Sequence, residues 1–297
     1  MRRRWKTVGA VTMVAAAFVT LAFAGSASAK LVGEFTKFQF CPFTNAEVNR
    51  CLHSLNTGGS VTMGSKKVSI VNPVTLQGGY SKANEEGFSK FFGATNGVTL
   101  SKAPQPIPGG LAGLVNCPEI SNFLLRISCE LTFENGITGV NSILELARPA
   151  SEIKISESHL AEGEGIALKL PVKIRLENPF LGSNCYVGSE SSPIWWELTS
   201  GITSPPPPNT PISGKPGEVS FLEGGRILKL SNSELVDNAW AAPKTNGCGG
   251  IFSFLLDPIV SASSGLPSAA GKNTTILKTT NHVATAVALK KVDAENP

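Results

Sequence analysis

The chain has 297 residues, of which 41% are hydrophobic and 16% charged, and this balance excludes an intrinsically disordered protein. Neither a Gly-X-Y repeat nor a heptad repeat is present, which excludes collagen and coiled coils. The formal net charge is +4, but residues 1–29 hold four basic and no acidic residues, so the remainder has 26 − 4 = 22 basic against 22 acidic side chains. A neutral remainder removes the electrostatic argument for nucleic acid or an anionic membrane as a partner.

The first 29 residues have the pattern of a secretory signal peptide. A basic start precedes an apolar run at 8–23, and the small residues ASA at 27–29 provide a cleavage site. A membrane anchor is the alternative, but this run of 16 residues is shorter than the ~20 that a spanning helix needs. We therefore predict a secreted or extracytoplasmic protein without a transmembrane anchor. In it, residues 30–297 form one β-rich domain, with a subdivision allowed near 149–165.

Most of the predicted elements are short strands separated by turns. The clearest strand is 166–176, in which every even residue is large and apolar and the odd residues include Lys169, Lys173 and Arg175. Pro171 lacks an N–H group and therefore predicts an edge position or a bulge for this strand. In chain order, the predicted elements are a hairpin (60–63 with 67–71), a helix (119–129), a strand (138–146), a helical turn (156–162), two strands (166–176 and 194–199), a hairpin (218–222 with 226–230) and two further strands (251–256 and 282–289).

Six cysteines follow the leader, and an even number in an exported chain favours disulfide bonds. Pairing of sequence neighbours gives Cys41–Cys51, Cys117–Cys129 and Cys185–Cys248. No C-x-x-C spacing is present and His53 is the only histidine near a cysteine, so no metal site is predicted. The predicted fold is therefore mainly β, an antiparallel β-sandwich or irregular barrel with one or two short helices, stabilised by disulfides.

Motifs that carry catalysis are missing from the sequence. It contains no G-x-S-x-G, Walker loop, H-E-x-x-H or EF-hand pattern, so we assign no catalytic residue and no cofactor. Nineteen glutamates leave room for a glycosidase pair, although the sequence does not select its members. Whether the chain is an enzyme stays open at this point.

Tryptophans are the candidate ligand-binding residues. Trp195 and Trp196 are adjacent, and on a strand their side chains point to opposite faces, so one can enter the core while the other faces outward. An exposed Trp beside Glu197 would suit stacking on a sugar ring, whereas a buried one only fills the core. Trp240 has the same two interpretations. A segment rich in Phe at 34–43 would suit either a core or an apolar cavity.

Four segments give the chain a family resemblance. They are CPFTN at 41–45 with Cys51, VTLQGG at 74–79, SSP at 191–193 before the proline run, and GLPSAAG at 265–271. With these segments the chain resembles uncharacterised exported proteins of actinobacteria. The resemblance implies an exported, disulfide-bearing protein and brings no activity or catalytic residue with it.

Three functional hypotheses follow from the sequence. The first is an exported protein that acts without catalysis, by binding or as an envelope-associated component, with a glycan or an envelope component as partner and with the oligomeric state open. The second is a secreted glycan hydrolase that uses an unassigned Glu pair. The third is an extracytoplasmic carrier of an apolar small molecule, which predicts an enclosed cavity lined by Phe and Leu.

Overall fold

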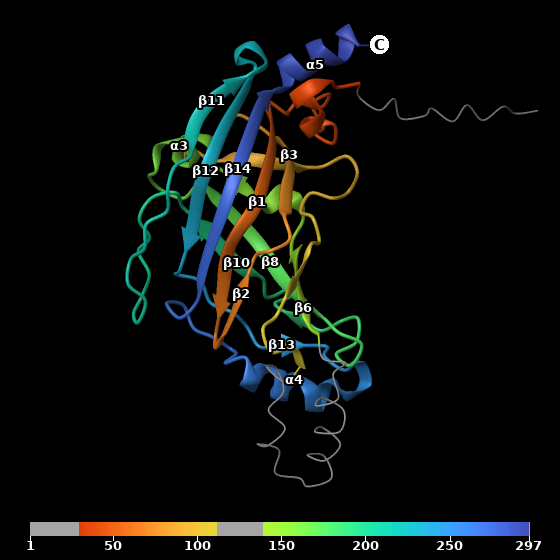
Figure 1. Cartoon of the computed structure of the whole chain (residues 1–297), viewed down its shortest axis with the longest axis vertical. Coiled ribbons are helices and arrows are strands. Elements are labelled where there is room, and N and C mark those ends of the chain that lie inside the picture. Colours follow the sequence, from red (N-terminus) through yellow and green to blue (C-terminus); the bar gives the residue numbers. More distant parts are fainter. Residues whose placement is uncertain (1–29, 112–138, 297) are drawn as a thin grey trace, which may run out of the picture.

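The computed structural model describes residues 30–111 and 139–296. Its strands form one antiparallel sheet of 14 strands in the order β11-β12-β14-β1-β3-β4-β7-β8-β6-β5, with β2, β9, β10 and β13 paired beside this path. The sheet does not close into a barrel. Instead it folds over, so that β8, β10 and β6 pass behind a layer made by β12, β14 and β1 (Figure 1). The predicted mainly β, antiparallel, disulfide-stabilised fold is confirmed.

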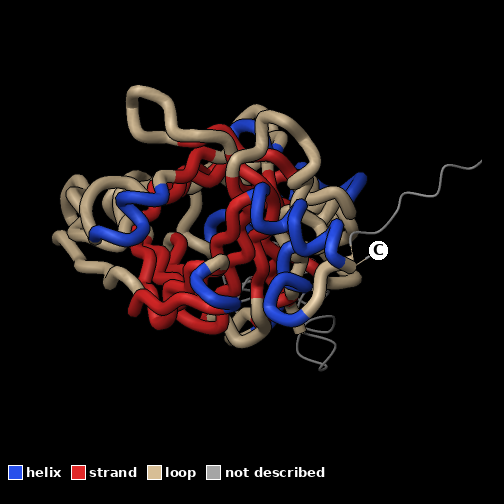
Figure 2. Tube along the Cα trace, turned by 90° about the horizontal axis from the view of Figure 1, so that it is seen from above, coloured by secondary structure: helices blue, strands red, loops and turns tan. Residues whose placement is uncertain are grey.

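The elements have the following bounds along the chain: η1 Gly33–Phe38, β1 Arg50–Met63, β2 Lys66–Ser69, β3 Val74–Tyr80, β4 Ser89–Gly93, β5 Pro104–Pro106, β6 Asn141–Leu146, η3 Ala150–Glu152, β7 Lys154–Ile155, α3 Glu157–Glu162, β8 Leu168–Glu177, β9 Tyr186–Val187, β10 Ile194–Leu198, β11 Glu218–Leu222, η4 Glu223–Gly225, β12 Ile227–Asp237, β13 Thr245–Asn246, η5 Gly250–Phe252, α4 Ser253–Ser263, β14 Thr274–Thr285 and α5 Ala286–Glu295. The helices α4 and α5 lie at opposite ends of the sheet (Figure 1), and Figure 2 shows the curved strands from above.

The two predicted hairpins are confirmed. Met63 pairs with Lys66 across a tight turn between β1 and β2, and Leu222 pairs with Ile227 between β11 and β12. The helical turn predicted at 156–162 corresponds to α3. The helix predicted at 119–129 and the Cys117–Cys129 pair lie outside the described residues.

Two predicted strands are wrong in whole or in part. Residues 251–256, predicted as a strand, belong to η5 and α4. The prediction failed because an apolar run of only six residues fits a strand and a helix equally well. The strand predicted at 282–289 ends at Thr285. There the hydroxyl of Thr285 accepts a hydrogen bond from the N–H of Ala288 at 3.1 Å and so caps the N-terminus of α5.

The edge position predicted from Pro171 is also wrong, because β8 has partners on both sides, β10 on one and β6 on the other. The N and C=O of one strand residue point to the same side of the strand. The oxygen of Pro171 accepts from the N–H of Ala147, one residue beyond the end of β6. The nitrogen of Pro171 points to the same side, beyond the last residue of β6. The missing N–H therefore costs no hydrogen bond within the β6–β8 pairing, and β8 can contain a proline without being an edge strand.

Two apolar clusters stabilise the fold on the two faces of the front layer. The larger one lies between the layers and includes Trp196, Leu170 and Leu277. The smaller one covers the outer face with η1 and α5 and includes Phe35, Phe38 and the first disulfide, Cys41–Cys51. The Phe-rich segment of the sequence therefore packs outside the sheet and not between its layers.

A candidate binding cavity between the layers

A cavity lies in the larger cluster, between the two layers of the sheet. Its volume is about 110 Å³. Residues of β1, β2, β3, β12 and β14 form one wall, and residues of β5, β6, β8, β9 and β10 form the other. The apolar members of the lining are Val61, Met63, Val68, Ile70, Val74, Leu76, Leu100, Ala103, Ile107, Leu144, Leu168, Leu170, Ile174, Leu176, Val187, Trp196, Leu235 and Leu277.

Strand β8 contributes to this lining through its alternation. Leu168, Leu170, Ile174 and Leu176 face the cavity, because successive side chains of a strand point to opposite faces. The eight residue steps from Leu168 to Leu176 correspond to about 26 Å of strand at ~3.3 Å per residue. Val172, at the middle of this stretch, is fully buried and does not line the cavity.

A β-bulge in β1 lets both halves of this long strand face the same cavity. Ser54 and Asn56 line it from even positions, whereas Val61 and Met63 line it from odd positions. A regular strand would turn one of these pairs outward. The register of β1 against β14 shifts between Asn56 and Gly58, and this extra residue restores the inward direction.

Gly59 makes this bulge sterically feasible. Its φ of +106° lies outside the range that side chains favour, and a Cβ there would meet the backbone oxygen of Ile276 at 2.0 Å. Any other residue at this position would push β1 away from β14.

The tryptophans predicted as ligand-binding residues do not lie together on one surface. Trp196 is fully buried and lines the cavity, whereas Trp195 is 42% exposed on the opposite face of β10. Trp240 is buried and meets Trp196 edge-on, with the ring centroids 6.1 Å apart. The alternation predicted for Trp195 and Trp196 is therefore present, and it places only Trp196 at the cavity.

Trp195 lies on the solvent-exposed face of β10. Glu197 lies two residues further on the same face of β10, and its carboxylate accepts a hydrogen bond from the Nζ of Lys169 at 2.8 Å. Asp237 has a raised pKa because burial disfavours its charged form, with Glu197 adding to the shift and two backbone N–H groups opposing it. Neither carboxylate lines the cavity. The hypothesis of a secreted glycan hydrolase with a Glu pair therefore stays a prediction.

The basic residues on the outer face of β8 form ion pairs. Arg175 contacts Glu145 at 3.1 Å, and Lys102 and Lys173 approach the same carboxylate within 4 Å. Glu145 is 8% exposed, so these pairs neutralise a nearly buried charge. These basic residues of β8 therefore form ion pairs on the outer face of the sheet and are not a free cationic surface.

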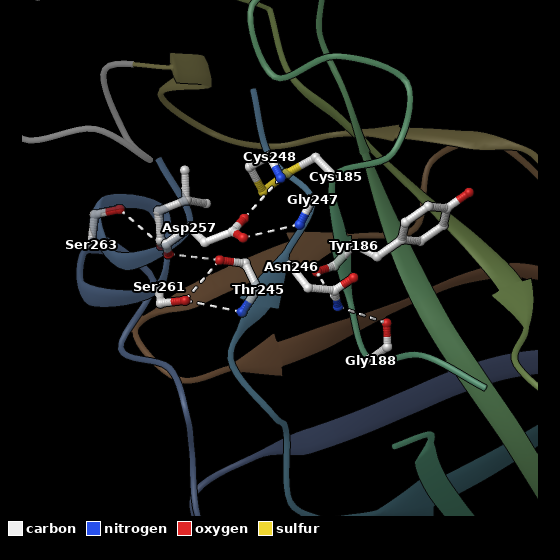
Figure 3. The surroundings of a disulfide bond; sticks show 11 residues. Cys185, Tyr186, Gly188, Thr245, Asn246, Gly247, Cys248, Asp257, Ser261 and Ser263 are labelled. Carbon is white, nitrogen blue, oxygen red and sulfur yellow. Dashed lines mark hydrogen bonds between the residues drawn. A yellow bond between two sulfur atoms is a disulfide. The ribbon is translucent and has the colours of Figure 1, made fainter. Parts of the chain in front are cut away.

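The second disulfide, Cys185–Cys248, lies next to α4 (Figure 3). Cys185 and Cys248 are fully buried, and both oxygens of Asp257 in α4 accept backbone N–H groups, from Cys248 at 2.8 Å and from Gly247 at 3.0 Å. The hydroxyl of Thr245 donates to the backbone oxygen of Asp257 at 2.8 Å. These contacts connect α4 to β13, and β13 pairs with β9 in the second layer.

Neither a metal-binding cluster nor a membrane-spanning helix is present in the described ranges 30–111 and 139–296. No group of three or more His, Cys, Asp or Glu residues in these ranges is placed to hold a metal ion. No helix in the same ranges combines the length and the apolar character needed to cross a bilayer.

A histidine pair on the outer face gives the molecule a predictable response to acid. His53 and His282 pair across β1 and β14 with ring centroids 6.2 Å apart, and the Nδ1 atoms of both rings are buried without a hydrogen-bond partner among the described residues. Burial, followed by the positive charge of Lys37, lowers the pKa of both, that of His282 to about 4. For His282, His53 and Lys229 act in the same direction, and Glu34 opposes them.

We expect this pair to destabilise the fold as the pH falls. An unfolded histidine titrates near pH 6.5, so between about pH 6.5 and 4 the unfolded chain binds more protons than the native one. The free energy of unfolding should drop by roughly 1–2 kcal/mol over this window on account of His282, after allowance for its partial hydration. Urea unfolding at both ends of the window measures the loss. Carboxylates also titrate in this pH window, so the His282→Gln variant is the control and should lose less unfolding free energy than the parent protein. An equal loss in the two proteins would contradict the role given to His282.

Comparison with known protein families, curated proteins and solved structures finds no match to this chain. The cavity is therefore the feature from which a function is proposed. Sequence patterns predicted the buried face of β8, which lines this cavity, but they did not indicate that both halves of β1 line it, because the bulge near Gly59 shifts the alternation of that strand.

Proposed function

We propose that this chain is an exported protein that acts by binding a small, slender apolar molecule in the cavity between its sheet layers. The proposal joins the first and the third hypotheses from the sequence. The observation that carries it is the lining of the cavity, in which 18 of 25 residues are apolar. Leu, Ile and Val dominate this lining, and the Phe residues expected there are not among its described members.

The size of the cavity supports a small ligand. A single buried water occupies about 10–15 Å³ by this kind of measure, and an apolar cavity of about 150 Å³ takes up benzene. Water gains few hydrogen bonds from such walls, so an apolar guest is favoured over solvent. Lining residues that are spread over about 26 Å of β8 favour an alkyl chain over a bulky ring system.

Export is part of the proposal. Two intramolecular disulfides, Cys41–Cys51 and Cys185–Cys248, suit an oxidising compartment, and the leader at 1–29 has the pattern of a signal peptide. Outside the cytoplasm, apolar molecules need a shielded site to remain in aqueous solution, and the cavity provides one.

Quenching of Trp196 tests the proposal directly, because this side chain lines the cavity. In a Trp195→Phe background, which removes the exposed ring, 6-bromohexan-1-ol, whose chain has as many carbons as benzene, should quench the remaining tryptophan fluorescence with saturation below its solubility limit. Leu144→Phe should weaken this binding by about tenfold, since the larger side chain fills space in the lining.

Val219→Phe is the matched control, because Val219 is exposed on β11 and is not part of the lining. It should leave the binding unchanged. Absence of saturable quenching in the background protein would refute the proposed function, and equal weakening in both variants would place the ligand elsewhere.

A further inference from the structure

One charged side chain stands out in the cavity. Lys66 is the only charged residue among the described members of the lining. It is the first residue of β2 and is half-buried, in a strand whose residues alternate between half-buried and exposed. Its neighbour Lys67 is exposed on the other face of the same strand and does not line the cavity.

Three other polar side chains of the lining have hydrogen-bond partners within the protein. The side-chain oxygen of Gln105 accepts from the N–H groups of Val71 and Asn72, and its nitrogen donates to the backbone oxygen of Asn72. Ser142 donates to the backbone oxygen of Gln105. Asn56 accepts from the N–H of Gly58. None of these three side chains is charged, so none can form an ion pair with a ligand.

The amine of Lys66 is different. No ion pair or side-chain hydrogen bond involves it in the described part of the chain, and no carboxylate lines the cavity there. The described lining therefore contains one cationic side chain and no compensating negative charge. Attraction between opposite charges is stronger beside an apolar wall than in bulk water, because the local dielectric constant is lower.

We infer that the ligand is an alkyl carboxylate, whose chain occupies the cavity while its carboxylate pairs with the Nζ of Lys66. This inference rests on the proposed function and adds the polar end of the ligand. Lys66 follows the β1–β2 turn, where the N–H of Ser65 donates to the backbone oxygen of Ser264 at the end of α4. The head group would therefore lie at the α4 end of the sheet (Figure 1), with the chain directed along β8.

A pair of probes with the same chain separates the two proposals. In the Trp195→Phe background, 6-bromohexanoate should bind about tenfold more tightly than 6-bromohexan-1-ol, as expected for a hydrogen bond to a charged group. Lys66→Met should remove this preference, so that the two probes bind this variant with equal affinity. Lys67→Met makes the same change of charge on the opposite face and should keep the preference. Added salt should reduce the preference only where Lys66 is present.

Each outcome has a defined consequence. Equal affinities of the two probes, or a preference that survives Lys66→Met, would overturn the role of Lys66 and leave the apolar cavity standing as the binding site. Loss of the preference in both lysine variants would show a general charge effect and would also overturn it. Absence of quenching by either probe would refute the proposed function itself. Thermal unfolding of both variants confirms that the fold is retained, since no described side chain forms an ion pair or a hydrogen bond with the amine of Lys66.

Discussion

Replacing Cys185 and Cys248 together with serine should lower the free energy of unfolding by about 4 kcal/mol, the largest effect that we expect from any pairwise change. The bond joins residues separated by 63 positions, so its loss frees a long loop in the unfolded chain. Both sulfurs are fully buried, and the serines would also leave two hydroxyls in an apolar setting.

Urea unfolding monitored by far-UV circular dichroism measures this change. The Cys41–Cys51 bond closes a loop of only 10 positions, so its double serine variant is the matched control and should lose about 3 kcal/mol. The two variants should differ in a second way. Loss of Cys185–Cys248 loosens the segment that holds α4, so it should also weaken quenching of Trp196 by 6-bromohexan-1-ol, whereas loss of Cys41–Cys51 on the outer face should not. A smaller loss of stability for the longer loop would contradict the expectation.

The sequence predicted the parts of the fold whose signal is local. Strand β8 alternates over its whole length, so its period of two alone shows that one face is buried. Both hairpins have glycine in their turns, at Gly64 and at 223–225, and the positive φ angles found there explain this composition. Pairing of neighbouring cysteines gave the two disulfides that the described residues contain.

Features that depend on distant contacts were not predictable. The length of β1 escaped prediction because its central part, with Asn56, Gly58 and Gly59, has no apolar alternation, and pairing with β14 and β3 makes it a strand. The bulge at this point places Val61 and Met63 in the cavity, and nothing local indicates it. The apolar run at 251–256 misled the prediction in another way. Its composition predicts a buried strand, yet its side chains are largely exposed, Ile251 to 84% and Phe254 to 71%.

The cavity itself arises from the way the sheet folds over. A sheet that packed closely on itself would fill the space between its layers with side chains, as the fully buried Val172 and Trp196 do locally. Along β8, however, Leu168 to Leu176 alternate evenly, while β1 and β2 approach from the other side with smaller residues such as Val61, Val68 and Ser54. The mismatch in size leaves unfilled volume, and the sequence of either layer alone does not reveal it.

Trp196→Ala should lower the free energy of unfolding by about 3–5 kcal/mol, the second large effect that we expect. The side chain is fully buried, and its removal would merge new empty space with the cavity and strip the edge-on contact from Trp240. Trp195→Ala is the control in the same strand, because its ring is 42% exposed on the other face and its loss should cost less than about 1 kcal/mol.

Chemical unfolding of the two variants measures this difference, and binding of 6-bromohexan-1-ol extends the test to function. The quenching assay needs Trp196 as its reporter, so calorimetry replaces fluorescence in the Trp196→Ala protein. If the cavity is the binding site, the wider space beside β10 should change the affinity in Trp196→Ala and leave it unaltered in Trp195→Ala. A change confined to Trp195→Ala would move the site to the face of β10 that carries Glu197 and favour a ligand that stacks on an exposed ring, because Trp195 is the only described tryptophan that is accessible from solvent.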